Sequence, residues 1–439
     1  RDCLLSRGLG DVYKRQARIL ALVKLANVGL VMIWGFAVTF VFVRVLPLAE
    51  FQAFLLLVAF GNFTISAEFG LTSIIYARLR RFWLGNDEGA ADGGFRLEEM
   101  GVLFLFLGLL IAGAVVILLG ALALGGLHTA MPTLFLLFFL TACLNLPALL
   151  AKRALAAIDG NFLWEGLDCA RRLVTIGLLA AILFGLDPRL SVALQLAVSV
   201  AVIGYAIVHV HRRLDMRRSH WFAFRVGGGH VRRHYLRDIG ASAAFTVSDI
   251  VAYNAPYFTI AMATSDARPM LLFDFFFKMS RSLSMLVRAM VEAALPRITR
   301  AYHAGESVRV RQLLTRALGA ALFFALAGSA LLMLVGGWLF DKLFDGRAAI
   351  DQADLGLTAL ALVALSVICV SVYVQAALGR FAHLLQRSLP FLAGSLLSVP
   401  LAGAFWPDRF DLGFLGLYAL TLMLAASLHL VSLRRLVRA

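Results

Sequence analysis

Apolar runs of about 20 residues recur along the chain and are separated by short polar breaks. A run of this length crosses the hydrocarbon core of a membrane as an α-helix. The pattern therefore predicts about twelve membrane-spanning helices, which we number in chain order. Their expected ranges are 19–43, 51–76, 100–123, 129–150, 164–186, 190–210, 239–263, 269–295, 313–340, 355–378, 388–405 and 412–433.

The fifth expected span, 164–186, has the weakest apolar pattern. Charged residues crowd its first half: Glu165, Asp168, Arg171 and Arg172. Because charges are costly inside a bilayer, an interfacial helix over part of this stretch is the alternative to a full span.

The composition indicates the same class of protein. Hydrophobic residues make up 61% of the 439 residues and charged residues 15%. Soluble domains average about 45–50% apolar and about 25% charged residues. We therefore expect an all-α integral membrane protein.

Lysine and arginine gather in alternate loops. The loops after even-numbered spans, together with the carboxyl tail, hold most of them. By the positive-inside rule these loops face the cytoplasm, so both termini are expected there. The loops on the other side hold only Arg44, Arg189, Arg268, Lys342, Arg347 and Arg409.

The longest cytoplasmic loop, 211–238, separates a first six-helix half, 19–210, from a second, 239–439. Contact of its many arginines with anionic membrane lipids is one interpretation, and an orientation signal alone is the other. The formal net charge is +15, but its placement between apolar runs does not indicate nucleic acid. The arginines of the loop are Arg212, Arg213, Arg217, Arg218, Arg225, Arg232, Arg233 and Arg237.

Residues 1–18 differ from the rest of the chain. The sequence starts at Arg1, and the stretch 1–16 (RDCLLSRGLGDVYKRQ) shares no pattern with the apolar runs beyond it. We expect a non-native or fragmentary segment there and find no cleavable signal peptide.

Motifs for catalysis or cofactor binding are not found. The four cysteines, Cys3, Cys143, Cys169 and Cys369, are far apart and predict small apolar side chains rather than a metal site. The sequence contains no GxxxxGKS, GxxxxGKT, HExxH or GxSxG motif. We therefore expect a transporter without a cofactor rather than an enzyme.

The eighth span carries a stripe of ionisable residues. Asp274, Lys278, Arg281, Arg288 and Glu292 recur at intervals of three, four or seven residues, which places them on one helix face. Asp274 and Lys278 are i,i+4 partners, as are Arg288 and Glu292. Such a face must point into the bundle or a water-filled cavity. The acids Asp274 and Glu292 are candidates for ion or proton coupling, and a structural ion-pair network is the alternative.

Arg281 has no acidic partner at helical spacing. It therefore needs either Asp249 on the preceding span or an anionic ligand. A guanidinium group binds phosphate through two parallel N–H groups, which suits a pyrophosphate. We expect Arg281, Lys278 and Arg288 to bind substrate.

The first half has fewer charges inside its spans. Lys24 and Asn27 lie one turn apart on the first span and are expected to join the substrate site, unless Lys24 merely extends to the headgroups. Glu68 lies deep in the second span and Asp249 deep in the seventh. Each is a candidate for ion or proton coupling, and a salt bridge is the alternative role.

Several segments resemble a known family in their order along the chain. Segment 44–81 resembles the opening helix pair of polysaccharide transporters, with Arg44, Leu46 and the run Glu68-Phe69-Gly70-Leu71 at the recurrent places. These transporters are the O-antigen and exopolysaccharide flippases of the multidrug/oligosaccharidyl-lipid/polysaccharide (MOP) superfamily. Similar segments follow at 294–318 (ALPRITRAYHAGESVRVRQLLTRAL), 337–346 (GWLFDKLFDG), 376–380 (AALGR) and 413–422 (GFLGLYALTL).

The resemblance implies two pseudo-symmetric six-helix halves around a central cationic cavity, lined by the first, second, seventh and eighth helices. It implies that a polyprenyl-pyrophosphate-linked oligosaccharide crosses the bacterial inner membrane by alternating access, for O-antigen, capsule or exopolysaccharide synthesis. Other glycan-assembly membrane proteins are expected as partners. Asp274, Lys278 and Glu292 match no fixed position of the family, so their roles rest on the helical face alone.

Other functions are also compatible with the sequence. A small-molecule secondary transporter, such as a drug/cation antiporter or a major-facilitator protein, fits the six-plus-six layout. A cation exporter should have an acid-dominated cavity, whereas the candidate residues here include at least as many bases. A glycosyltransferase usually needs a sizeable outer loop, for which the spans leave no room. A scaffold for glycan assembly is the remaining alternative.

Overall fold

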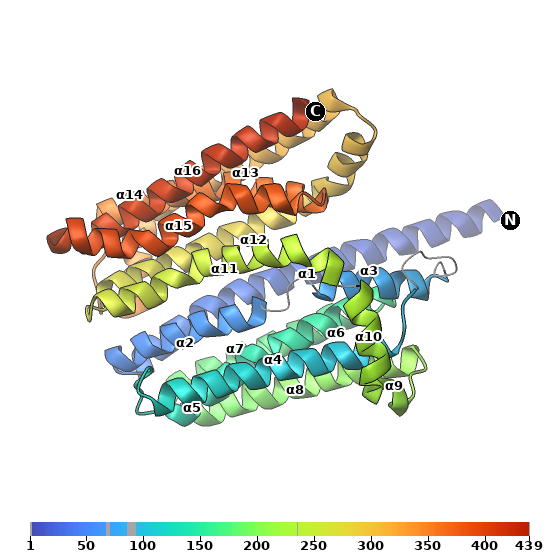
Figure 1. The fold of residues 1–439 in the computed structure, drawn as a ribbon, viewed down its shortest axis with the longest axis horizontal. Coiled ribbons are helices and arrows are strands. Elements are labelled where there is room, and N and C mark those ends of the chain that lie inside the picture. The colour runs from blue at the N-terminus through green and yellow to red at the C-terminus, as the bar shows by residue number, and fades with distance from the viewer. Residues whose placement is uncertain (1, 67–70, 86–93, 235, 439) are drawn as a thin grey trace. The chain divides into compact units, whose positions relative to one another are not determined.

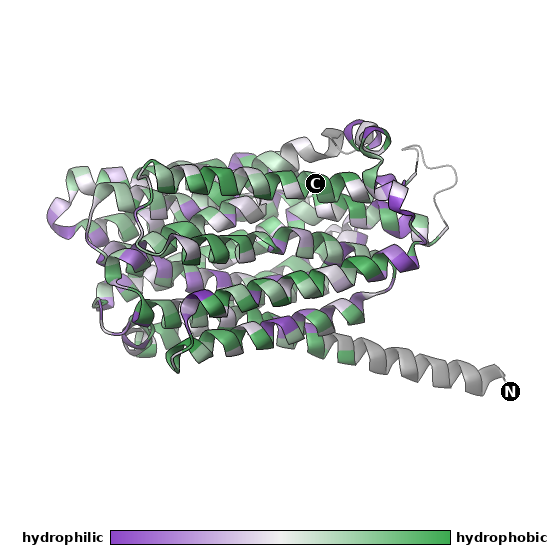
Figure 2. Cartoon of the chain, turned by 90° about the horizontal axis from the view of Figure 1, so that it is seen from below, coloured by the Kyte–Doolittle hydropathy of each residue, from purple (hydrophilic) through white to green (hydrophobic). Residues whose placement is uncertain are grey.

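The computed structural model describes residues 2–66, 71–85, 94–234 and 236–438. Over these residues the chain forms sixteen α-helices and one short 3-10 helix, and they contain no strand (Figure 1). The predicted all-α architecture is therefore confirmed. Hydrophobic residues run along the lengths of the helices, and many hydrophilic residues lie near their ends (Figure 2).

The helices group into two compact units, of which the first comprises residues 1–41 and 70–239. α1 (Asp2–Val45) belongs to it as far as Val41. Its other helices are α3 (Leu71–Trp83), α4 (Glu98–Ala123), α5 (Pro132–Cys143), α6 (Asn145–Ala157), α7 (Asn161–Leu183), α8 (Pro188–Arg213), α9 (Arg218–Phe222) and α10 (Phe224–His234).

The second unit comprises residues 42–69 and 240–439. It includes the end of α1 and most of α11 (Leu236–Ala263). Its other elements are α2 (Leu48–Ser66), α12 (Arg268–His303), α13 (Ser307–Phe344), α14 (Gln352–Ala377), α15 (Phe381–Phe405), η1 (Pro407–Arg409) and α16 (Phe410–Arg438).

The segment 42–69 packs with the second unit, although it precedes most of the first unit in the sequence. Reciprocal hydrogen bonds hold its beginning. Arg44 donates to the carbonyl oxygen of Lys342 at 2.7 Å, and Arg347 donates to the carbonyl oxygen of Leu46 at 3.0 Å. Each arginine thus satisfies a backbone acceptor of the other segment, and these contacts join the start of the segment to the end of α13.

Within the described residues, eight helical segments are long and apolar enough to cross a membrane. They coincide with eight of the predicted spans. The predicted span 129–150 consists of two consecutive helices, α5 and α6, which meet at Leu144. The eight segments are Leu22–Val45, Glu98–Ala123, Pro132–Ala157, Pro188–Arg213, Ser307–Phe344, Gln352–Ala377, Phe381–Phe405 and Pro407–Leu436.

The four other predicted spans depart from this simple pattern. The predicted span 51–76 contains most of α2 and the start of α3, and residues 67–70 between them lie outside the described residues. α7, α11 and α12 are continuous helices of 23, 28 and 36 residues. Their interiors carry the ionisable side chains that interrupt an apolar run, and these side chains are the candidates for function.

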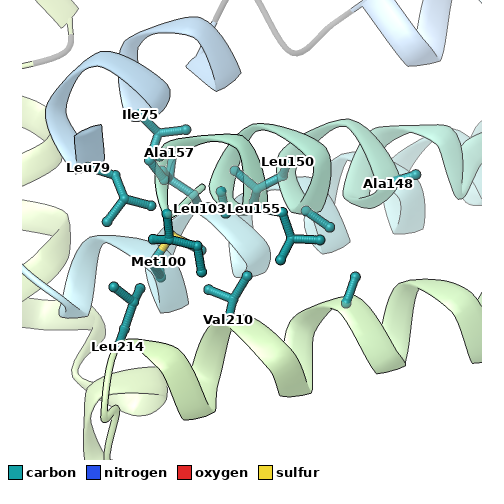
Figure 3. Close-up of a cluster of buried hydrophobic side chains, with 14 of the residues drawn as sticks. Ile75, Leu79, Met100, Leu103, Ala148, Leu150, Leu155, Ala157, Val210 and Leu214 are labelled. Carbon is teal, nitrogen blue, oxygen red and sulfur yellow. The ribbon is translucent and has the colours of Figure 1, made fainter. Parts of the chain in front are cut away.

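Side chains of α3, α4, α6, α7 and α8 form an apolar core of the first unit, part of which is shown in Figure 3. Ile75 and Leu79, one turn apart on α3, face Met100 of α4. Leu155 of α6 and Val210 of α8 belong to the same cluster, and all five side chains are at most 1% exposed. In a membrane such a core stabilises the bundle through close packing, since lipid tails are as apolar as the side chains.

Aromatic side chains join three helices of the second unit. The ring centroid of Phe273 on α12 lies 4.9 Å from that of Tyr257 on α11 and 5.6 Å from that of Tyr418 on α16. Phe276 lies 5.4 Å from Tyr418. All three pairs have the edge-to-face geometry that the ring quadrupoles favour. This aromatic cluster fixes α11 and α12, the helices that carry Asp249 and the predicted polar stripe.

Candidate functional site

The predicted stripe begins on α12 with a balanced ion pair. Asp274 is 1% exposed. One carboxylate oxygen accepts a hydrogen bond from the Tyr257 hydroxyl at 2.8 Å, and the other pairs with the Lys278 ammonium group. The i,i+4 pair expected from the sequence is formed. Both carboxylate oxygens therefore have a donor, and the hydrogen bond from Tyr257 ties α12 to α11 without any ligand.

Two arginines of the same face are exposed further along α12. The Arg281 guanidinium lies 5.7 Å from the ring centroid of Phe277, and that of Arg288 lies 5.8 Å from Tyr373. Arg288 also donates to Glu292 at 2.7 Å. Arg281 makes no ion pair with a residue that the structure describes. An aromatic ring holds a cation in place without neutralising it, so the Arg281 charge is available to an anion.

Asp249 lies partly exposed on α11. The expected pair with Arg281, one of two alternatives, is not formed between these two described residues. The phenol groups of Tyr253, Tyr373 and Tyr418 lie within electrostatic range of the Asp249 carboxylate. A carboxylate without a basic partner among the described residues can take up a proton or cation without first breaking an ion pair.

Pro256 interrupts the backbone hydrogen bonding of α11. Proline has no N–H group, so the carbonyl of Ala252, four residues earlier, lacks its helical donor. The Ser395 hydroxyl of α15 donates to this carbonyl oxygen at 2.5 Å, and the Tyr418 hydroxyl of α16 at 3.5 Å. Side chains of neighbouring helices thus supply the hydrogen bonds that the Ala252 carbonyl oxygen lacks within α11. In a membrane interior, where water is absent, such internal donors are required.

The second half of α2 meets α11 through a pair of amides. Asn62 donates to the side-chain oxygen of Asn254 at 3.1 Å, and Asn254 donates to the carbonyl oxygen of Ile250 at 2.9 Å. Glu68, the candidate coupling acid of the second predicted span, lies outside the described residues.

In the first unit, Asn27 of α1 meets two acids of α7. Its Nδ2 donates to Glu165 Oε2 at 2.8 Å and to Asp168 Oδ2 at 2.9 Å. The three residues are only 5%, 3% and 4% exposed. Lys24, one turn earlier, is exposed. The amide nitrogen of Asn27 is therefore directed at two carboxylates, whereas the sequence predicts a role in substrate binding.

Three basic side chains complete this cluster on α6 and α7. Lys152 Nζ lies 3.3 Å from Glu165. Arg171 and Arg172 reach Asp168 at 2.6 Å and 3.0 Å. Three cations thus surround two carboxylates, so a further cation can bind the acids only by displacing one of them.

The sequence predicts that the acids of this cluster weaken the fifth span and predicts no further role for them. The signal was available, because Glu165, Asp168 and Arg172 follow one another at intervals of three and four residues, which places them on one helix face. The partner Asn27 is 138 residues from Glu165 and carries no charge, so no spacing rule connects them. Asn27 Oδ1 is buried and has no partner among the described residues.

A second ion-pair network joins the beginnings of three helices. Arg268, in the first turn of α12, reaches Asp351 and Asp354 at 2.9 Å and Asp411 at 2.6 Å. It also donates to the carbonyl oxygen of Ala349 at 3.0 Å. This network fixes α12, α14 and α16 against one another. In the part of the chain that the structure describes, no group of His, Cys, Asp or Glu forms a metal site.

Comparison with known proteins gives no match to a family model or to a curated protein sequence. Solved structures do match. A mutant of the Vibrio cholerae MATE transporter VcmN is 15% identical with a TM-score of 0.64, covering 97% of this chain and 98% of that chain. The eukaryotic MATE transporter AtDTX14 is 14% identical with a TM-score of 0.62 and the same coverage.

A third match is the inward-facing conformation of a multidrug resistance MATE family transporter of the MOP superfamily. It is 14% identical with a TM-score of 0.65, covering 95% of this chain and 98% of that chain. The chain therefore has a MATE-like fold, with twelve transmembrane helices in two halves, and is a multi-pass membrane protein. This third neighbour is described as a member of the superfamily that the sequence resembles.

Proposed function

We propose that this chain is a secondary transporter that moves a small organic solute across a membrane by alternating access, in exchange for protons or cations. The observation that carries this proposal is the MATE-like fold, which extends over 95% or more of this chain and 98% of each of the three neighbours named above. One of these neighbours is described as a multidrug resistance transporter. In transporters built from two helical halves, rocking of the halves exposes one site to either side of the membrane in turn.

Coupling to protons or cations requires an acid whose charge is not already balanced. Ion pairs occupy Glu165, Asp168 and Asp274. Asp249 has no such partner among the described residues and lies within electrostatic range of phenol groups on three helices. We therefore assign the coupling role to Asp249.

The test is transport of a fluorescent organic cation into proteoliposomes under an imposed pH gradient. Asp249→Asn should abolish gradient-driven uptake and leave binding of the dye in place. Glu306→Gln is the matched control, because Glu306 is exposed in the loop before α13 and pairs only with the exposed Arg309 among the described residues. Uptake by Asp249→Asn at the wild-type rate would remove Asp249 from the mechanism.

A second candidate function is translocation of a polyprenyl-pyrophosphate-linked oligosaccharide in the bacterial inner membrane, beside other glycan-assembly proteins. The exposed guanidinium groups of Arg281 and Arg288 favour it. A pyrophosphate is stabilised by such cationic donors, whereas an organic cation is repelled by them.

Native mass spectrometry of protein purified from a glycan-producing bacterium distinguishes the two functions. For the second function, a polyprenyl-pyrophosphate saccharide should remain bound to the wild type and be lost in Arg281→Ala. Arg281→Lys should retain part of it, because lysine keeps the charge and lacks the fork of donors. Arg309→Ala is the control. Absence of this lipid from the wild type, together with cation uptake that depends on Asp249, would leave only the first function.

A further inference from the structure

The two short helices that come after α8 are docked tightly on the beginning of α4. A Cβ atom added at Gly227 of α10 would lie 2.7 Å from the carbonyl oxygen of Glu98 and 2.8 Å from Val102. A Cβ atom added at Gly101 of α4 would lie 2.8 Å from the Cα and carbonyl carbon of Trp221 on α9, and closer still to its carbonyl oxygen. Because neither glycine leaves space for a methyl group, α9 and α10 are held at backbone contact with α4.

Polar contacts hold the same helices in place. His230 of α10 is 8% exposed, and its Nε2 lies 2.9 Å from the Arg78 guanidinium and 3.0 Å from Glu99 Oε1. The indole N–H of Trp221 donates to His211 Nδ1 at 3.0 Å. The segment 211–234, which contains α9 and α10, is thus a fixed part of the first unit rather than a loose connection.

This segment lies where membrane spans end. α8 is a candidate span that ends at Arg213, and α4 is a candidate span that begins at Glu98. Helices docked on the terminal turns of two spans lie at the boundary between hydrocarbon and water. The strongly basic character of the segment is typical of the cytoplasmic side of a membrane.

The exposed side chains of the segment are both basic and apolar. Asp215 is the single acid between residues 211 and 234. Phe222, Phe224 and Val226 are 73%, 37% and 53% exposed. Exposed aromatic and aliphatic side chains between arginines are typical of helices that lie in the interface of a membrane. The exposed arginines are Arg212, Arg213, Arg217, Arg218, Arg225, Arg232 and Arg233.

We propose that α9 and α10 form a binding surface for the anionic phospholipids of the adjoining leaflet. Guanidinium groups form paired hydrogen bonds with the phosphate oxygens, and the exposed Phe222 and Phe224 rings insert beside the upper acyl chains. The tight docking on α4 keeps the arginines of α10 at the height of the headgroups. The alternative role of these arginines is an orientation signal during membrane insertion. That role does not require α9 and α10 to pack against α4.

The test measures lipid preference in the full-length protein and is independent of the transported solute. Purified protein in neutral detergent is titrated with phosphatidylglycerol and with phosphatidylcholine, and bound lipids are counted by native mass spectrometry. The test variant replaces Arg218, Arg225, Arg232 and Arg233 by Gln. A basic residue at an anionic surface is worth about fivefold in affinity at low salt, so we expect the preference for phosphatidylglycerol to fall by at least about tenfold.

The matched control replaces four exposed arginines at the junction of α12 and α13 by Gln: Arg297, Arg300, Arg309 and Arg311. It should keep most of the preference. An equal loss in both variants, or no loss in the first, overturns the proposal. Binding of a DNA oligonucleotide as tightly as phosphatidylglycerol at the same salt also overturns it, because the surface would then attract any polyanion.

A second variant changes the docking without changing the charge. Gly227→Leu should separate α10 from α4 and lower the preference for phosphatidylglycerol, with the thermal unfolding midpoint measured in parallel to show that the helical bundle is intact. If Gly227→Leu binds phosphatidylglycerol like the wild type, docking on α4 does not present the arginines, and that part of the proposal is wrong.

Discussion

Asn27 Nδ2 lies 2.8 Å from Glu165 Oε2 and joins α1 to α7 inside the first unit. The side chain can adopt only one orientation of its amide, because the reverse orientation would direct Oδ1 at two carboxylates. The second acid, Asp168, accepts from the same nitrogen. Asn27 therefore acts as a neutral donor among charges that are otherwise balanced by lysine and arginine.

Stability should fall in the order wild type, Asn27→Ala, Asn27→Asp. Alanine removes hydrogen bonds to charged groups, each worth about 1.5–3 kcal/mol. Aspartate adds a third carboxylate next to Glu165 and Asp168, and like charges at this distance repel in a medium of low polarity. The measurement is the thermal unfolding midpoint of the purified protein at neutral pH.

Lys24→Gln is the control for this series, because Lys24 is exposed on the same helix. It should leave the midpoint unchanged. If Asn27→Asp is as stable as the wild type, the cluster takes up a proton or cation that compensates the new carboxylate, and its role is then coupling rather than packing.

The ion pair of Asp274 and Lys278 should show strong coupling in a double-mutant cycle. Asp274→Asn leaves the Lys278 ammonium group without its acid in a largely buried position. Removing one partner of a buried pair costs about 3–5 kcal/mol. The double variant Asp274→Asn/Lys278→Gln should recover most of this loss, since two neutral amides can still bond each other and Tyr257. Additive losses in unfolding experiments would show that the two charges do not stabilise each other.

Local rules predicted much of what the structure contains. The spacing of Asp274 and Lys278, and of Arg288 and Glu292, predicts the two ion pairs that form on α12. Helix geometry alone places such partners together. Apolar runs predict the long helices for a similar reason. Whether a segment can span a membrane depends only on the residues of that segment.

Local spacing does not predict contacts between segments that are far apart in the sequence. Asn27 and Asp168 are 141 residues apart, and nothing in the spacing of either segment selects the other. The predicted span 51–76 cannot be compared along its whole length, because residues 67–70 lie outside the described residues. For Arg281 the sequence left two partners open, Asp249 and an anionic ligand, and among the described residues Arg281 and Asp249 do not pair.

The bond from Ser395 to the Ala252 carbonyl should matter only because Pro256 is present. Ser395→Ala leaves a buried carbonyl with a weaker donor and should cost about 1–3 kcal/mol. In a Pro256→Ala background the residue at 256 regains an N–H group that can donate to Ala252. The same serine substitution should then cost much less. The wild type, the two single variants and the double variant are compared by thermal unfolding. If Ser395→Ala destabilises both backgrounds equally, Pro256 is not the reason that the serine hydroxyl is needed.

Gly394 of α15 allows a close approach of α15 to α16. A Cβ atom at this position would overlap the Cβ and Cγ2 atoms of Thr421, and small residues at such crossings let membrane helices pack closely. Gly394→Ala should therefore destabilise the protein by about 1–3 kcal/mol. Thr421→Ala should not rescue it, because the overlapping Cβ atom stays, whereas Thr421→Gly should.

Gly403→Ala on the same helix is the matched control. The nearest atom to an added Cβ there is a ring carbon of Phe410 at 3.9 Å, an ordinary contact. Since alanine favours a helix over glycine by about 1 kcal/mol, this variant should be as stable as the wild type or more so. Equal unfolding midpoints for Gly394→Ala and Gly403→Ala would mean that α15 and α16 separate readily, and the close crossing would then contribute nothing to the second unit.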